Sequence, residues 1–216
     1  MQAGIAENHS NSLKGEIFRK MIHYSSASIS IGYYFIDKNI VLLVLSILLL
    51  LMFIVEFIKY KSDSIYKLYL KYFKDMLREH EYDRRKFRVN GASWVIISAI
   101  VCILLFPKLI AIMGMLMLSL ADSTGGLLGR LYGKKKYAPN RSYVGTIVFF
   151  IVGLIVITVT PKYTYTAKEY LIGFAAVVFT TLAEAINLYV DDNFTVPFIA
   201  SLSLYILYLI FMNGVF

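Results

Sequence analysis

Long runs of apolar residues, separated by short polar segments, repeat along most of this 216-residue chain. An α-helix needs roughly 20 apolar residues to cross the hydrocarbon core of a bilayer, and it satisfies its own backbone hydrogen bonds there. The pattern predicts an all-α fold: a polytopic membrane helical bundle of about seven transmembrane helices, with residues 1–216 forming a single integral membrane domain. Pro107 and Pro197 are expected to open the fourth and seventh spans, since the first helical turn does not need the missing N–H. The expected spans are 17–36, 39–58, 92–106, 108–130, 143–160, 169–189 and 196–214.

Segment 62–80 differs from the spans because its apolar residues alternate with basic ones at helical spacing. Such an amphipathic helix lies in the plane of the membrane, with its cations toward anionic headgroups. The sequence predicts one cytoplasmic interfacial helix here, and a solvated connector is the alternative. The apolar face carries Ile65, Tyr66, Tyr69, Phe73, Met76 and Leu77, and the polar face carries Lys67, Lys71, Lys74, Asp75 and Arg78.

Composition excludes a soluble domain, because 58% of the residues are hydrophobic and only 17% are charged, against about a quarter charged in soluble domains. The net charge of +8 is unevenly placed: 18 of the 22 Lys and Arg fall in 14–20, 59–90 and 130–141, and four fall in the alternate loops. This asymmetry predicts a cytoplasmic N-terminus, cytoplasmic basic loops and a C-terminus outside. A nucleic-acid partner is therefore not needed to explain the charge. The lone Cys102 excludes a disulfide framework and a cysteine metal site.

Carboxylates lie near the ends of several spans, where an ionised acid costs on the order of a few kcal/mol unless it is paired, hydrated or functional. The apolar run 109–121 is too short to cross alone, so the fourth helix is expected to continue through Asp122. Glu184 interrupts the sixth span, and Glu56 closes the second. These acids are expected to meet near the cytoplasmic boundary. Structural pairing with Arg19, Lys20 or His23 is the alternative.

Two further acids and an amide, Asp191, Asp192 and Asn193, precede the last span. A negative charge at a helix N-terminus is favoured by the helix dipole, so capping would explain one of the acids. Two adjacent carboxylates with an amide are also a plausible site for a hard cation such as Mg²⁺. That site would lie on the same face of the membrane as Asp122.

Segment 122–145 combines small residues with cations and is the expected cytoplasmic-side nucleotide-binding segment. Glycines spaced along one helical face leave it bare, so that a ligand or another backbone can come close. Ordinary helix packing would explain the glycines alone, and a positive-inside anchor would explain the lysines alone. A polyphosphate would use both features together with Asp122, since it needs cations, backbone room and carboxylates for Mg²⁺. The residues are Gly125, Gly126, Gly129, Arg130, Gly133, Lys134, Lys135, Lys136, Arg141, Ser142 and Gly145.

The order and spacing of these elements resemble the family of CTP-dependent lipid kinases. That family includes dolichol kinase, phytol kinase and the yeast-type diacylglycerol kinase, and it is related to phosphatidate cytidylyltransferase. The resemblance covers about residues 16–200. Where dolichol-kinase and cytidylyltransferase members tend to have Lys-Ser/Thr-x-Glu-Gly, this chain has Arg141-Ser142-Tyr143-Val144-Gly145, which favours the phytol-kinase-like branch. The matching motifs are Glu16-x-x-Arg19-Lys20-x-x-His23, Glu56, Asp122-x-x-Gly125-x-x-x-Gly129-Arg130-x-x-Gly133-Lys134, Arg141-Ser142-x-x-Gly145, Glu184 and Asp191-Asp192-Asn193-x-Thr195-Val196-Pro197.

The resemblance implies phosphoryl transfer from CTP to the hydroxyl of a membrane lipid alcohol, with Mg²⁺ as cofactor. A polyisoprenoid alcohol such as a polyprenol, dolichol or phytol is the first expected acceptor, and diacylglycerol is the second. Asp122 and Glu184 are the candidate catalytic acids, and Asp122, Asp191, Asp192 and Asn193 are the candidate metal ligands. Arg19, Lys20, His23 and Glu56 are expected to support them. A CDP-lipid-forming cytidylyltransferase is the alternative enzyme, and a secondary transporter, which usually has internal repeats and midplane acids, is the alternative of another class.

Overall fold

A computed structural model describes residues 13–73, 89–138, 141–186, 190–212 and 215 of the chain. These residues are almost entirely helical, which confirms the all-α prediction, and the two short strands pair as one antiparallel hairpin. The elements are α2 (Leu13–Ser25), α3 (Ala27–Phe35), α4 (Lys38–Lys61), α5 (Asp63–Phe73), α6 (Gly91–Leu105), α7 (Lys108–Leu116), the π-helical turn η3 (Met117–Asp122), α8 (Ser123–Tyr132), β1 (Lys136–Ala138), β2 (Arg141–Ser142), α9 (Tyr143–Val159), α10 (Ala167–Ile186) and α11 (Asp192–Phe211).

Four helices in the described part of the chain are long and apolar enough to cross a membrane: Lys38–Lys61, Lys108–Tyr132, Ala167–Ile186 and Asp192–Phe211. Two shorter apolar helices, Gly91–Leu105 and Tyr143–Val159, accompany them. The expected first span, 17–36, is divided into α2 and α3 by a turn at Ser26. The bundle of membrane helices is therefore confirmed, whereas the count of seven spans is not. Helix α5 covers 63–73 of the expected interfacial helix, and residues 74–80 lie outside the described part.

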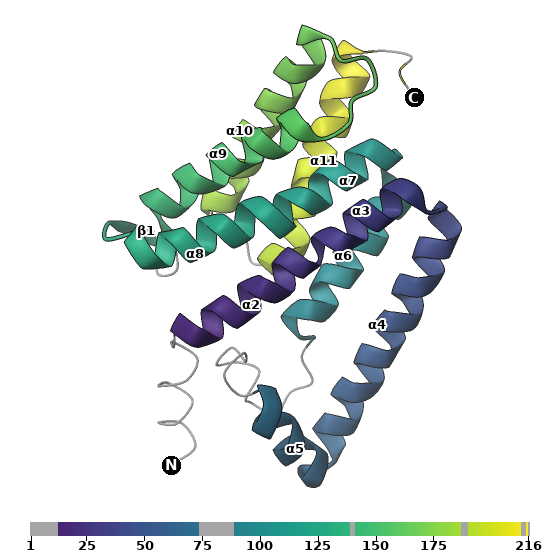
Figure 1. The fold of residues 1–216 in the computed structure, drawn as a ribbon, viewed down its shortest axis with the longest axis vertical. Helices are drawn as coiled ribbons and strands as arrows, with labels where there is room; N and C mark the ends of the chain where they lie inside the picture. Colours follow the sequence, from purple (N-terminus) through teal and green to yellow (C-terminus); the bar gives the residue numbers. More distant parts are fainter. Residues whose placement is uncertain (1–12, 74–88, 139–140, 187–189, 213–214, 216) are drawn as a thin grey trace.

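The continuous helix formed by α7, η3 and α8 lies at the centre of the bundle (Figure 1). In the most apolar 18-residue stretch of this helix, 67% is buried inside the protein, compared with 17% in the corresponding stretch of α4. Helices α9 and α11 pack on one side of it, with α10 against both of them, and α2, α3 and α6 also pack on the central helix. Helix α4 contacts α6 along one face and diverges from α2, with α5 at its far end. Most of the α4 surface is left to face lipid.

Side-chain caps explain where several of these helices begin. Asp37, Asn90, Ser142 and Asp191 each accept a hydrogen bond from a backbone N–H in the first turn of α4, α6, α9 and α11 respectively. Because Asp191 caps α11, that helix begins at Asp192 and Pro197 lies inside it. The expectation that Pro197 opens the last span is therefore wrong, whereas α7 does begin directly after Pro107.

The loop between α9 and α10 closes around a buried carboxylate at the end of the bundle opposite to the N-terminus (Figure 1). Glu169 is fully buried and accepts backbone hydrogen bonds from Tyr163 (2.7 Å), Thr164 (2.9 Å) and Tyr165 (2.8 Å). The hydroxyl of Tyr208 on α11 donates to the same carboxylate at 2.6 Å. The carboxylate thus ties the loop to α11. The sequence showed no sign of this role for Glu169, because Glu169 is the third residue of a helix and resembles an ordinary first-turn acid.

Glu169→Gln is expected to lower the free energy of unfolding by about 2–4 kcal/mol, because an amide offers one acceptor oxygen and would leave backbone donors buried and unpaired. Thermal melting in detergent checks this value. Glu184→Gln at the other end of the bundle removes the same charge without touching this loop. An unchanged melting temperature for Glu169→Gln would show that the loop does not depend on the carboxylate.

Candidate active site

Three polar contacts hold α2 along the central helix at the π-helical turn. Lys20 donates from Nζ to Asp122 Oδ2 at 2.8 Å, and the hydroxyls of Tyr24 and Thr124 lie 2.8 Å apart. Ser26 and Ser119 form the third contact, also at 2.8 Å. A π-turn inserts an extra residue into a helix and is frequent at functional sites. Here it ends at Asp122, the residue that the sequence placed at the membrane edge.

Asp122 is set in a basic environment formed by segments far apart in the chain. Its side chain is 13% exposed and is paired with Lys20, whose ammonium also donates to the Asp122 carbonyl at 3.2 Å. His23, one turn further along α2, and Arg141 add positive potential at the carboxylate. The carboxylate of Asp122 therefore lies among positive charges contributed by α2 and β2.

Arg141 links three elements at the same end of the bundle. It lies on β2, is almost fully buried, and donates from Nη1 to Glu184 at the end of α10. Its Nη2 donates to Asp192 Oδ1 at 2.9 Å, in the first turn of α11. A guanidinium suits this position because its planar fork presents several donors at fixed angles. We call Lys20, Asp122, Arg141, Glu184 and Asp192 the acid–base cluster.

The cluster brings acids and bases from five elements together at one end of the bundle. Among the described residues, Glu184 Oε2 is buried and has no hydrogen-bond partner. A buried carboxylate oxygen without a donor is costly and can be satisfied by a cation or a ligand. No group of three or more His, Cys, Asp or Glu in the described ranges could hold a metal by itself. Mg²⁺ commonly binds through one or two carboxylates and the phosphates of its nucleotide, and these carboxylates fit that use.

The glycine face of α8 packs against α9. A Cβ at Gly125 would lie 2.8 Å from the Gly145 carbonyl oxygen, and one at Gly129 would lie 2.8 Å from the Gly145 Cα. Ser142 donates to the Gly129 carbonyl and accepts from the Gly145 N–H, both at 3.1 Å, while Gly133 lies directly against Ser142. A ligand or another backbone was expected against this glycine face, and the structure places the backbone of α9 there. Gly126 is different: it is exposed, and its open side is covered by the Lys20 side chain.

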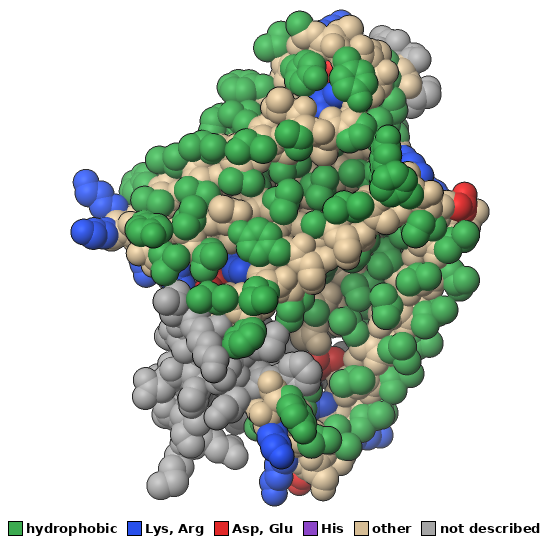
Figure 2. Space-filling model, in the orientation of Figure 1, with side chains coloured by type: hydrophobic (Ala, Val, Ile, Leu, Met, Phe, Trp, Pro, Cys, Tyr) green, Lys and Arg blue, Asp and Glu red, His purple; other side chains and the backbone are tan. Residues whose placement is uncertain are grey.

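The remaining cations of this segment lie outside the acid–base cluster. Arg130 is exposed and donates to Glu16 Oε2 at 3.1 Å, and Arg19 pairs with the same carboxylate. Burial works against ionisation of Glu16, but Arg19 and the neighbouring cations outweigh it and lower the pKa of this acid. Lys134, Lys135 and Lys136 are exposed at the start of the hairpin, and in the described part of the chain none of them pairs with the cluster. Figure 2 shows basic side chains projecting at that end of the molecule.

Two expected metal ligands and one expected supporting acid serve other contacts. Asp191 caps α11, and Asn193 is buried and donates to the Gly91 carbonyl at 3.0 Å. Glu56 accepts from Asn90 at 2.6 Å and pairs with Lys59 at 2.7 Å. These contacts join the ends of α4, α6 and α11 beside the acid–base cluster. Asn193 and Glu56 thereby position the helices that carry it.

Sequence analysis missed the hydroxyl residues that join α2 and α3 to the central helix: Tyr24, Ser26, Ser119 and Thr124. Hydroxyls are common in membrane helices because they can bond to their own backbone. Ser119 carried one signal, since it is a polar residue inside the apolar run 109–121.

The fold and the cluster define a class: an all-α integral membrane protein with a charged site at one end of its helical bundle. Comparison with curated proteins narrows this class to one kind of enzyme. The chain is 29% identical to CTP-dependent diacylglycerol kinase 1 of Saccharomyces cerevisiae over 94% of its own length and 74% of the relative. It is 27% identical to the protein of the same name from Schizosaccharomyces pombe, over 91% of this chain and 95% of the relative. An uncharacterised protein of Rickettsia prowazekii is 24% identical over 83% of this chain and 88% of its own.

The chain is thus similar over most of its length to CTP-dependent lipid kinases, the family that its sequence motifs resemble. No protein-family model matches the chain. No solved structure matches it.

Proposed function

We propose that this protein transfers the γ-phosphoryl group of CTP to the hydroxyl of diacylglycerol, yielding CDP and phosphatidate. The names of the two yeast relatives favour diacylglycerol over the polyisoprenoid alcohols that were the first expectation. The observation that carries the proposal is the acid–base cluster, in which Asp122 lies beside Lys20 and Arg141 at one end of a membrane bundle. A lipid hydroxyl lies at the headgroup boundary, where the end of such a bundle meets water.

The cluster supplies the electrostatics that phosphoryl transfer needs. That reaction depends chiefly on positioning and on neutralising charge on the transferred group. Lys20 donates to Asp122 directly and Arg141 adds positive potential there, and both would offset the charge of the triphosphate. Asp122 would orient the lipid hydroxyl and accept its proton. Asp122, Glu184 and Asp192 would hold Mg²⁺ together with the nucleotide, and the metal would shield the phosphate oxygens.

The outer cations have a separate role in this proposal. Lys134, Lys135 and Lys136 are exposed and would attract the nucleotide from water toward the cluster, an effect that falls with ionic strength. The end that carries the cluster would face the cytoplasm, with the N-terminus there and the C-terminus outside. The excess of Lys and Arg in the loops of that end supports this orientation.

Labelled nucleotides test the proposal directly. The protein in lipid nanodiscs is given CTP labelled at the γ or the α phosphate, or γ-labelled ATP, with diacylglycerol, a polyprenol or phytol. We expect the γ label of CTP to appear in phosphatidate. Appearance of the α label in lipid would identify a cytidylyltransferase instead. No labelled lipid with any pair of substrates would contradict the kinase assignment.

A further inference from the structure

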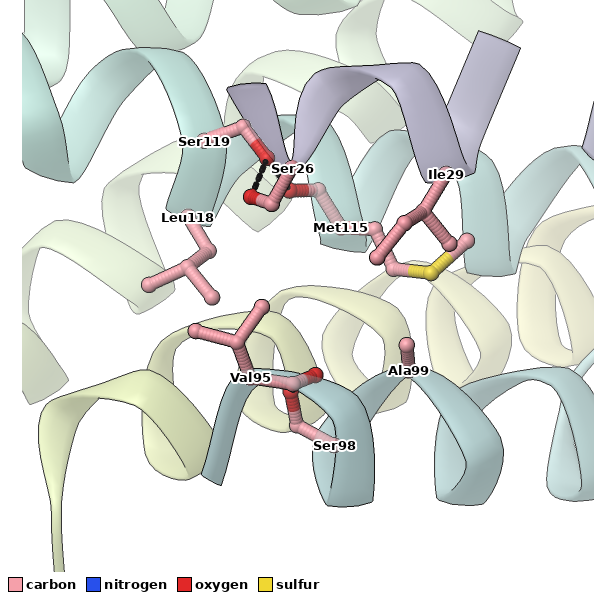
Figure 3. Close-up of a pocket in the computed structure, with 8 residues that line it drawn as sticks. All are labelled: Ser26, Ile29, Val95, Ser98, Ala99, Met115, Leu118 and Ser119. Carbon is pink, nitrogen blue, oxygen red and sulfur yellow. Dashed lines mark hydrogen bonds between the residues drawn. The ribbon is translucent and has the colours of Figure 1, made fainter. Parts of the chain in front are cut away.

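A small hollow lies between the start of α3, α6 and the central helix (Figure 3). Figure 3 shows Ser26 and Ser119 joined across its rim, with Val95, Ser98 and Ala99 on the opposite wall. Ile29, Met115 and Leu118 complete the lining. The hollow has room for about one water molecule, so it fits a single oxygen atom with its substituent outside.

The position of the hollow relates it to Asp122. Ser119 and Asp122 belong to the same π-helical turn, three residues apart, so their Cα atoms lie within one turn of the central helix. A lipid whose hydroxyl lies at Asp122 would place the next few atoms of its backbone near Ser119 and the hollow.

At the rim of the hollow, the two hydroxyl protons of Ser26 and Ser119 lie within hydrogen-bonding distance of three acceptor oxygens. Ser26 donates to the His23 carbonyl at 2.6 Å, and Ser119 lies 3.1 Å from the Met115 carbonyl and 2.8 Å from the Ser26 oxygen. Two protons thus serve three acceptors. The Ser119 proton has no single short partner of its own, since Met115 and Ser26 compete for it. Another acceptor entering the hollow could take it while the Ser26 hydroxyl stays bonded to its helix.

We infer that the Ser26–Ser119 pair is a recognition site for an ester carbonyl of the lipid acceptor, with Ser119 donating to it. This inference rests on the proposed kinase function. In diacylglycerol an ester carbonyl lies only a few bonds from the free hydroxyl, and it accepts a hydrogen bond without donating one. A polyprenol or phytol has no polar atom near its hydroxyl. An apolar hollow with one available donor therefore selects a glycerol ester over an isoprenoid alcohol.

The opposite wall provides a matched control. Ser98 lines the same hollow and is also buried, but its hydroxyl donates to the Val95 carbonyl at 2.9 Å in its own helix. Ser98→Ala removes the same atom as Ser119→Ala, from a hydroxyl that has a single internal partner. The two variants separate recognition of a carbonyl from a general effect on the hollow.

The experiment compares diacylglycerol with its dialkyl ether analogue, which keeps the hydroxyl and chains but lacks both carbonyls. We expect the wild type to prefer the diacyl substrate by about tenfold in kcat/KM, the value of one hydrogen bond to a carbonyl. Ser119→Ala should lose this preference through a slower reaction with the diacyl substrate alone. Ser26→Ala should reduce it partly, and Ser98→Ala should retain it. Activity on the dialkyl substrate reports that each variant is folded.

Equal activity of the wild type on the two lipids would overturn the inference while leaving the kinase function in place. An equal decrease on both lipids in Ser119→Ala would also overturn it, since that result indicates a structural role. Transfer to a polyprenol and not to diacylglycerol would have the same consequence. Absence of transfer to every acceptor would instead contradict the proposed function.

Discussion

Asp122→Asn is expected to lower kcat for lipid phosphorylation by about 100- to 1000-fold, the range seen when one polar group of a preorganised site is lost. The amide keeps an oxygen that can accept from Lys20, so the contact between α2 and the central helix is retained. It removes the negative charge and the capacity to accept a proton from the hydroxyl. The measurement is γ-phosphoryl transfer from CTP to diacylglycerol, together with the melting temperature in detergent.

The chain offers a matched control at the other end of the bundle. Asp37 caps α4 through a hydrogen bond from the Asn39 N–H, and asparagine caps a helix as well as aspartate does. Asp37→Asn is therefore expected to leave both activity and melting unchanged. Full activity of Asp122→Asn would remove Asp122 from the reaction.

Arg141→Lys is expected to lower activity by about 100-fold, because a small misplacement of charged groups at a reacting centre has effects of that size. The ammonium of lysine can reach Glu184 or Asp192 but cannot hold both as the guanidinium fork does. Loss of one buried contact is also expected to lower the free energy of unfolding by about 2 kcal/mol. Activity and chemical denaturation are measured on the same preparation.

Arg130→Lys makes the same substitution at an exposed arginine of the same segment, whose partner is Glu16. We expect it to change activity by less than about threefold, since exposed ion pairs contribute little. If Arg141→Lys behaved like Arg130→Lys, the linkage of α10 and α11 through Arg141 would not be needed for the reaction.

The sequence predicted that distant acids lie near one another, with pairing to Lys20 as the alternative, and the structure pairs Asp122 with Lys20. The apolar run before Asp122 was too short to end the helix there, and Glu184 interrupted an otherwise apolar span. Since charge is costly in lipid, such residues must find partners, and Lys20 and Arg141 are among those that the motifs indicated. The cost of an unpaired charge in lipid is thus large enough that a single sequence indicates which residues need a charged partner.

The details that could not be predicted depend on packing. Spacing shows that Gly125 and Gly129 share a helical face, but it does not show whether α9 or a ligand covers that face. The division of the first expected span at Ser26 and the π-turn before Asp122 also depend on contacts between helices, such as Ser26 with Ser119. Asn193 was expected beside a metal because amide oxygens bind cations; that its amide nitrogen also donates to the Gly91 carbonyl could not be predicted from spacing.

The proposed reaction requires that the triphosphate of CTP bind at the acid–base cluster. A structure of the protein in nanodiscs with Mg²⁺ and a non-hydrolysable CTP analogue tests this most directly. We predict density for the triphosphate against Lys20 and Arg141, with its γ-phosphate facing Asp122 and the hollow at Ser119. Density confined to the lysines of the hairpin, or elsewhere on the bundle with the cluster unchanged, would contradict the account.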